Sequence, residues 1–124
     1  GDVAFDEVRG GTILSTEDLF SHLARALNPD RILLAGLESA VWEDFPARTR
    51  KVESITPETF SQVAENIAKA VGADVTGGMR SKVTQMLDLV QQNPLLKIQI
   101  FSGAEPGNIL GALTGETLGT WITA

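Results

Sequence analysis

The pattern of apolar and polar positions predicts strands that alternate with helices. Two short extended stretches, residues 3–6 and 11–14, flank a turn that contains Gly10, which is typical of a β-hairpin. A continuous apolar run over residues 32–35 predicts a strand that is buried on both faces, as in parallel sheets. Residues 96–101 alternate between apolar and polar side chains, which predicts a strand with one less buried face.

Helix-start signals precede two amphipathic segments. Ser15 and Asp18 fit a capping box, and leucines at every fourth position follow on one helical face. Thr56 and Pro57 fit the N-cap and the first position of a second helix. Gly72 is expected to end that second helix, because glycine is common just past a helix C-terminus.

The remaining elements complete an α/β pattern. A glycine turn at Gly77 and Gly78 is expected to separate the second helix from a third, over residues 79–90. Residues 108–113 predict a short helix, and residues 119–123 predict a closing strand. Because strands and helices alternate, the sequence predicts an α/β fold of three layers, α/β/α, with a mainly parallel sheet.

Composition and charge narrow the class of protein. The chain has 124 residues, 43% of them hydrophobic, which fits one globular domain. Its net charge of −6 argues against a nucleic-acid partner, since phosphate backbones require clustered Lys and Arg. No apolar run reaches the ~20 residues of a membrane span, so no membrane partner is expected. A cytoplasmic location is expected, since it is compatible with this sequence. Cysteine is absent and His22 is the single histidine, which excludes thiolate chemistry and a multi-histidine metal centre.

The segment from Asp74 to Lys82 is the strongest candidate for chemistry. Gly77 and Gly78 stand before a predicted helix, where glycine lets backbone N–H groups approach an anion and the helix start adds free donors. Lys82 is placed to reach a phosphate as a point charge. A plain linker between two helices, with Lys82 in solvent, is the alternative. The spacing is not that of a Walker loop, which has a wider gap between its glycines.

Five short motifs resemble, in order, those of the amino acid kinase superfamily. The string from Asp74 to Lys82, DVTGGMRSK, resembles the GGM-x-x-K element of that superfamily. Its D-V-T prefix is similar to isopentenyl phosphate kinases, and fosfomycin-phosphorylating kinases are similar too. The other matches are the opening GDV, the TILSTED segment, IFSG and the closing GE with GT. The resemblance therefore covers nearly the whole chain.

The resemblance implies that the chain is the ATP-binding half of such a kinase. Lys82 matches the lysine that neutralises phosphate charge, and Glu17 falls where the family has the aspartate that orients catalytic lysines. Glutamate at this position is one methylene longer than the usual aspartate. On the phosphate side, the residues expected to bind ATP are Asp74, Thr76, Gly77, Gly78, Met79 and Lys82. Capping of the glycine turn is the alternative role for Asp74.

The loop that follows the strand at residues 32–35 departs from the family pattern. The family reads T-D-V-D-G-V, whereas this chain reads GLESAV and lacks both aspartates and the glycine. A tryptophan follows where the family often has a tyrosine, and it is expected to pack against adenine. The residues expected to contact the nucleotide from this loop are Gly36, Leu37, Ser39, Val41 and Trp42.

These matches imply transfer of the γ-phosphoryl group of ATP to a small phosphate-bearing acceptor, with isopentenyl phosphate as the first choice. Mg²⁺ is expected with ATP, held by its phosphates rather than by protein ligands. The chain opens with Gly1, so residues 1–124 are expected to be one half-domain without an acceptor-binding half, inactive alone and homo-oligomeric. The alternatives are a non-catalytic nucleotide-sensing or structural module, and a kinase of the fosfomycin, acetylglutamate or aspartate type.

Overall fold

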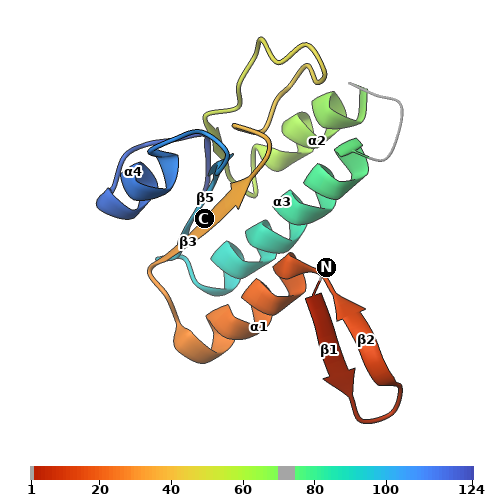
Figure 1. Ribbon diagram of the computed structural model, residues 1–124. Helices are drawn as coiled ribbons and strands as arrows, with labels where there is room; N and C mark the ends of the chain where they lie inside the picture. Colours follow the sequence, from red (N-terminus) through yellow and green to blue (C-terminus); the bar gives the residue numbers. More distant parts are fainter. Residues whose placement is uncertain (1, 70–74) are drawn as a thin grey trace.

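The computed structural model describes the backbone of residues 2–69 and 75–124, and the side chains of residues 3–65 and 78–124. Ten helices and strands lie in this part of the chain (Figure 1). In chain order they are β1 (Asp2–Asp6), β2 (Gly10–Leu14), α1 (Thr16–Leu27), β3 (Arg31–Gly36), β4 (Ser54–Ile55), α2 (Phe60–Lys69), α3 (Val75–Gln92), β5 (Lys97–Ser102), α4 (Asn108–Thr114) and β6 (Thr120–Ile122).

A four-stranded sheet in the order β3-β5-β6-β4 forms the centre of the molecule. β3 pairs in parallel with β5 and β4 with β6, whereas β5 and β6 are antiparallel. Figure 1 shows α4 on one face of the sheet, and α3 with α1 and α2 beside it on the other. The predicted three-layer α/β fold with a mainly parallel sheet is confirmed.

The main core lies between α3 and the sheet. Val83, Met86 and Val90 on α3 are fully buried, and they face Ile98 of β5 and Ile122 of β6 within one apolar cluster. The spacing of the α3 residues places them on one helical face, as the sequence pattern predicted. Burial of this face anchors α3 across the sheet, and it therefore sets which side of the helix faces the sheet.

Two strand predictions are wrong in detail. β3 was expected to be buried on both faces, but Leu33 is half-buried and Ala35 is exposed, because β3 is the end strand of the described sheet. β5 was expected to have one less buried face, but Gln99 is fully buried. Its Nε2 atom donates to the carbonyl oxygens of Glu116 (3.1 Å) and Leu118 (2.7 Å), and these bonds offset the cost of burying an amide.

Two helix starts also differ from the prediction. α2 begins at Phe60 rather than directly after Thr56. Thr56 still makes the hydrogen bonds expected of an N-cap: its hydroxyl accepts from the Thr59 N–H at 3.3 Å, and its carbonyl accepts from the Phe60 N–H at 2.9 Å. α3 begins at Val75, so Gly77 and Gly78 lie in its first turn instead of in a turn before it. The buried face of α3 outweighs the cost of about 1 kcal/mol per glycine in a helix. Gly72, the predicted end of α2, lies outside the described residues.

Helices α1 and α3 are joined at their C-terminal ends. The predicted capping box starts α1: Ser15 accepts from the Asp18 backbone N–H at 3.0 Å, and the Asp18 side chain accepts from the Ser15 N–H. Asn28 ends the helix in the left-handed conformation, at φ 49°. The Asn93 side chain, just beyond α3, donates to the Asn28 side chain at 2.8 Å. His22, midway along α1, is exposed, as expected for a surface residue.

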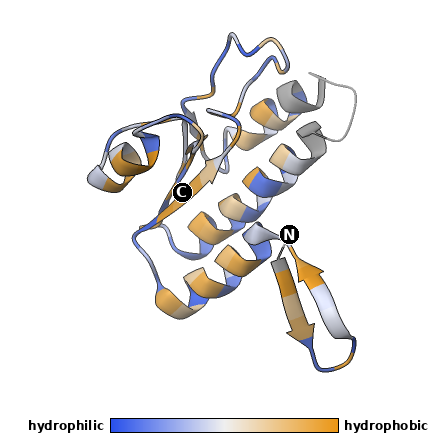
Figure 2. Ribbon diagram, viewed as in Figure 1, coloured by the Kyte–Doolittle hydropathy of each residue, from blue (hydrophilic) through white to orange (hydrophobic). Residues whose placement is uncertain are grey.

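The predicted β1–β2 hairpin is confirmed, and it extends away from the body of the molecule (Figure 1). Val3 pairs with Ile13, and Phe5 lies on the same face two residues along. All three side chains are exposed, Phe5 to 98%. Figure 2 shows hydrophobic residues along much of the hairpin, so one apolar face meets solvent in this chain.

Candidate active site

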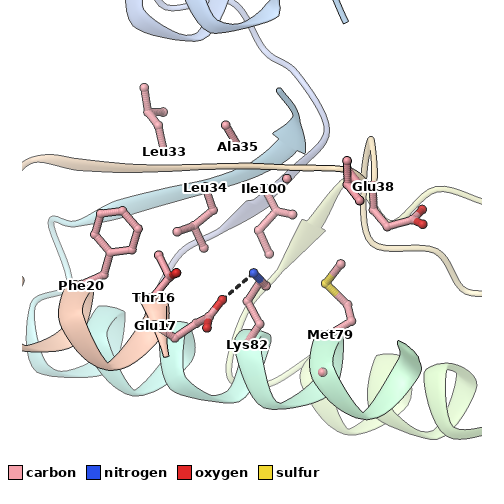
Figure 3. A pocket seen from close by; sticks show the side chains of 13 residues that line it. Thr16, Glu17, Phe20, Leu33, Leu34, Ala35, Glu38, Met79, Lys82 and Ile100 are labelled. Atoms are coloured by element: carbon pink, nitrogen blue, oxygen red, sulfur yellow. Dashed lines mark ion pairs between the residues drawn. The ribbon is translucent and has the colours of Figure 1, made fainter. Parts of the chain in front are cut away.

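A cavity of about 600 Å³ lies between β3 and the N-terminal parts of α1 and α3. Figure 3 shows Leu34 and Ile100 forming its sheet side, opposite side chains from the two helices. Its lining consists of Thr16, Glu17, Phe20, Leu33, Leu34, Ala35, Gly36, Leu37, Glu38, Gly78, Met79, Lys82 and Ile100. The cavity is therefore mostly apolar, with charged groups at particular points.

The charged centre of the cavity is an ion pair between the Lys82 ammonium and the Glu17 carboxylate (Figure 3). The Glu17 side chain is 16% exposed and that of Lys82 is 30% exposed. Burial acts to raise the pKa of Glu17, but the hydrogen bond and charge of Lys82, with a backbone N–H, outweigh it and hold the pKa below its ordinary value of 4.5. Glu17 is therefore a carboxylate at neutral pH.

The two helices fix this pair from opposite sides. The capping box at Ser15 sets the start of α1, so Glu17 lies in its first turn. Lys82 lies about two turns inside α3, because α3 starts at Val75, before the glycines where a turn was predicted. Helical side chains lean toward the N-terminus, so the lysine reaches back along α3 toward the helix start. The glutamate, one methylene longer than the family's usual aspartate, reaches Lys82 and forms the ion pair.

The start of α3 contributes backbone as well as charge. Gly78 and Met79 line the cavity, and a Cβ atom placed on Gly78 would meet nothing within 4 Å. The N–H groups in the first turn of a helix have no intrahelical acceptor and bind anions readily. Thr76 and Gly77 lie in this turn, whereas Asp74 lies outside the described residues. Lys82 and residues of the first two turns of α3 thus lie at one end of the cavity, an arrangement that suits an anionic ligand such as phosphate.

The β3–β4 loop, residues 37–53, borders the opposite end of the cavity. Gly36 and Leu37 line it, and their predicted contact with a nucleotide stays a prediction. Ser39, Val41 and Trp42 do not line it: Val41 is fully buried, and Trp42 forms an isolated antiparallel bridge with Lys51. Trp42 is therefore part of the packing within the loop in this structure, and its contact with a base stays a prediction.

Sequence reasoning missed several cavity residues. Phe20, Leu34 and Ile100 were recognised only as apolar positions of predicted elements, and no local signal distinguishes a cavity wall from core. Glu38 was also missed. Both of its oxygens accept from the Arg48 guanidinium, at 2.7 and 2.9 Å, across ten residues of loop. Such a pairing depends on how the loop folds, which the sequence pattern does not contain.

The Glu38–Arg48 pair sets the charge at the loop end of the cavity. The hydrogen bonds from Arg48 lower the pKa of Glu38 against the smaller raising effect of burial, and they raise the pKa of Arg48. The Trp42 indole N–H lowers the pKa of Glu38 only weakly, since it forms no hydrogen bond of good geometry. Arg48 also stacks on Phe45, 4.6 Å from the ring centre. Each end of the cavity thus has a carboxylate paired with a cation: Glu17 with Lys82, which both line the cavity, and Glu38 with Arg48, of which only Glu38 lines it.

Within the described residues, no group of three or more acidic, histidine or cysteine side chains is arranged to hold a metal ion. Binding of Mg²⁺ through nucleotide phosphates stays a prediction. The same residues include no helix that is long and apolar enough to cross a membrane.

Comparison with known proteins identifies the family. The family model described as "Amino acid kinase family" matches residues 1–102. Isopentenyl phosphate kinases from Methanocaldococcus jannaschii and Methanothermobacter thermautotrophicus are each 30% identical, over 98% and 99% of this chain. The chain spans only 44% and 47% of the lengths of these relatives. The isopentenyl phosphate kinase of Haloferax volcanii is 37% identical over 72% of this chain and 34% of its own length.

Solved structures share the fold at lower identity. The N-acetylglutamate synthase of Neisseria gonorrhoeae, complexed with coenzyme A and L-arginine, matches 91% of this chain and 24% of its own, with a TM-score of 0.65 and 20% identity. The uridylate kinase of Archaeoglobus fulgidus matches 90% of this chain and 48% of its own, with a TM-score of 0.59 and 18% identity. Sequence match, fold and the lysine–carboxylate cavity agree, and the chain belongs to the amino acid kinase family.

Proposed function

We propose that this chain forms the nucleotide-binding part of a kinase that transfers the γ-phosphoryl group of ATP to a phosphate-bearing acceptor, namely isopentenyl phosphate. The observation that carries the proposal is the ion pair of Lys82 with Glu17 inside the cavity, beside the start of α3. A half-buried cation next to free helix N–H groups is suited to an anionic ligand.

The residues at this end act by position and charge. Lys82 neutralises phosphate charge, and Glu17 holds the Lys82 side chain in the cavity through their ion pair. Backbone N–H groups of the first turn of α3 donate to phosphate oxygens, and the open space at Gly78 in that turn allows a close approach. ATP bound here with Mg²⁺ supplies the phosphoryl group, which passes from the β–γ bridging oxygen to an acceptor oxygen and leaves ADP. Phosphoryl transfer requires little more of a protein than this positioning and charge neutralisation.

The acceptor is inferred from the relatives rather than from this chain. Three relatives carry the name isopentenyl phosphate kinase, and two of them align with almost all of residues 1–124. The chain spans less than half of their length, so the acceptor contacts are proposed to lie mostly outside it. Residues 1–124 alone are therefore proposed to bind nucleotide without turnover.

Titration with ATP and Mg²⁺ tests the nucleotide site. The chain has two tryptophans, so a Trp121→Phe background isolates the fluorescence of Trp42 in the loop, and calorimetry gives an independent affinity. Lys82→Ala is expected to weaken ATP binding about tenfold or more, because a charge-assisted contact with phosphate is lost. Lys51→Ala is the matched control, since Lys51 forms an exposed ion pair with Glu53 away from the cavity. Absence of binding up to millimolar ATP, or equal affinity in the two variants, would contradict the proposal.

A non-catalytic module is the second candidate. An N-acetylglutamate synthase shares this architecture, and fold alone does not decide function. Assay of the longest protein that contains this sequence, with isopentenyl phosphate, fosfomycin and acetylglutamate as acceptors, separates the candidates. ATP binding without product from any acceptor would favour the non-catalytic module, and product from one acceptor would identify the kinase type.

A further inference from the structure

The β3–β4 loop borders the cavity, yet its base is held by a strand that does not line the cavity. Within the loop, the Val52 N–H donates to the Val41 carbonyl at 2.9 Å, and the Glu43 N–H donates to the Arg50 carbonyl at 2.9 Å. The loop is therefore closed into a narrow hairpin-like shape. Its two sides meet at Val41 and Val52, which are both buried.

Thr120, the first residue of β6, joins both sides of this base. Its hydroxyl accepts from the Val41 N–H at 2.9 Å and donates to the Val52 carbonyl at 2.6 Å. The Thr120 side chain is fully buried. A hydroxyl supplies one donor and can accept as well, so this single group satisfies one backbone atom on each side of the loop.

Gly119, the residue before Thr120, makes a second contact with the loop. It has φ +62°, and a Cβ atom placed on it would lie 1.9 Å from the Ile100 carbonyl oxygen and 2.7 Å from that of Ser39. Only glycine fits this conformation and this close approach. The backbone of the loop at Ser39 thus rests directly against Gly119. Immediately before Ser39 come Glu38 and Leu37, which line the cavity.

We infer that Gly119 and Thr120 are positioning residues of the nucleotide site, which hold the loop rim of the cavity in place from β6. The closing GT of the sequence otherwise has no role, because neither residue lines the cavity. This inference rests on the proposed nucleotide-binding function. In physical terms, the loop is pre-organised. Because β6 fixes the loop before a ligand arrives, ligand binding does not carry the entropy cost of ordering the loop.

The decisive variant is Thr120→Val, which keeps the shape of the side chain and removes both hydrogen bonds. We expect ATP–Mg²⁺ affinity to fall about tenfold, because Val41 N–H and Val52 C=O lose their buried partner and the rim moves. Thr120→Ser keeps the hydroxyl and should restore affinity to near that of the unchanged chain. Leu89→Ala is the control for stability alone, since Leu89 is buried and lines a separate cavity beside Asn28. It should lower the melting temperature without a comparable loss of affinity.

Amide hydrogen exchange gives a readout that does not depend on ATP. In the unchanged chain the Val41 amide is expected to exchange slowly, as in the sheet, and in Thr120→Val it should exchange faster relative to the Ile98 amide of β5. Fast exchange at Val41 in the unchanged chain overturns the inference even if the valine variant fails to fold. Unchanged ATP affinity in a folded Thr120→Val chain overturns it and leaves the proposed function intact. Absence of ATP binding to the unchanged chain overturns the proposed function, and the nucleotide role of Thr120 with it.

Discussion

The two ends of the cavity are built by different means. At the helix end, Lys82 and Glu17 are held by regular helices, and the side chains themselves carry the charge. At the loop end, the family residues are replaced, and the loop is shaped by backbone hydrogen bonds to Thr120 and by the close approach at Gly119. The same cavity thus depends on side-chain identity at one end and on backbone geometry at the other.

The difference shows which kinds of substitution each end tolerates. Charge neutralisation of a phosphate requires a cation at one place, so the helix end retains the lysine of its motif. A loop that encloses a ligand requires a shape, and many side chains are compatible with the same backbone path. The loss of two aspartates in GLESAV is therefore compatible with an ordered loop, provided that the contacts beneath it stay in place.

Gly119→Ala is expected to have the largest effect, since it acts on the backbone geometry of the loop end. The added Cβ would overlap the Ile100 carbonyl oxygen, so the free energy of unfolding should fall by about 3 kcal/mol or more. Gly115→Ala is the matched control: its φ is also positive, at +100°, but the Cβ meets nothing within 4 Å. It should cost only about 1–2 kcal/mol from backbone strain. If urea unfolding gives the two variants the same loss of unfolding free energy, the close approach at Gly119 does not add to the cost of the substitution.

Glu17→Gln tests the side-chain end and should have an intermediate effect. The pKa of Glu17 is lowered on folding, so its ion pair stabilises the protein above pH 4.5, and that stabilisation is lost as pH falls through the lowered pKa. The variant should therefore be less stable by about 1 kcal/mol at pH 7 and equal to the unchanged chain at strongly acidic pH. Glu53→Gln is the control at an exposed pair and should show little difference at any pH. A stability difference for Glu17→Gln that persists unchanged into acid would rule out the ion pair as its source.

Arg48→Ala should have the smallest effect on global stability, because the Arg48 side chain is largely exposed. Its effect should be local: loss of both hydrogen bonds to Glu38 and of the stacking on Phe45 should loosen residues 43–50. Amide exchange should rise there and stay constant in β3 and β5. Arg48→Lys keeps the charge but not the paired donors, and is expected to resemble the alanine variant. Full protection in the lysine variant would show that charge, rather than geometry, orders the loop.

Much of the fold was predictable because its signals are local. The Ser15–Asp18 capping box, the apolar run of β3 and the stripe on α3 each follow from residues close in sequence. The other features of the fold depend on packing between residues that are far apart in the sequence. Gln99 has the polarity of an exposed position, yet carbonyl groups seventeen and nineteen residues away satisfy its buried amide. The insertion of β6 between β5 and β4 has no signature in a period or a motif.

The candidate site divides in the same way. Lys82 and Glu17 were predicted from motif resemblance, and the structure brings them together. The phosphate turn was placed wrongly by a few residues, since two adjacent glycines suggest a break and the buried face of α3 overrides it. Thr120 shows most clearly what the sequence cannot predict. A threonine in a strand is common, and its role is visible only once its two backbone hydrogen-bond partners are known.

Helix α1 is held to the body of the molecule along its whole length. The Glu17–Lys82 pair holds its start, Phe20 and Ala24 pack against the core, and its end is bonded through Asn28 to Asn93. The hairpin continues directly into α1 through Ser15. The exposed apolar face of Val3, Phe5 and Ile13 is therefore carried on a helix whose first turn contributes Glu17 to the cavity.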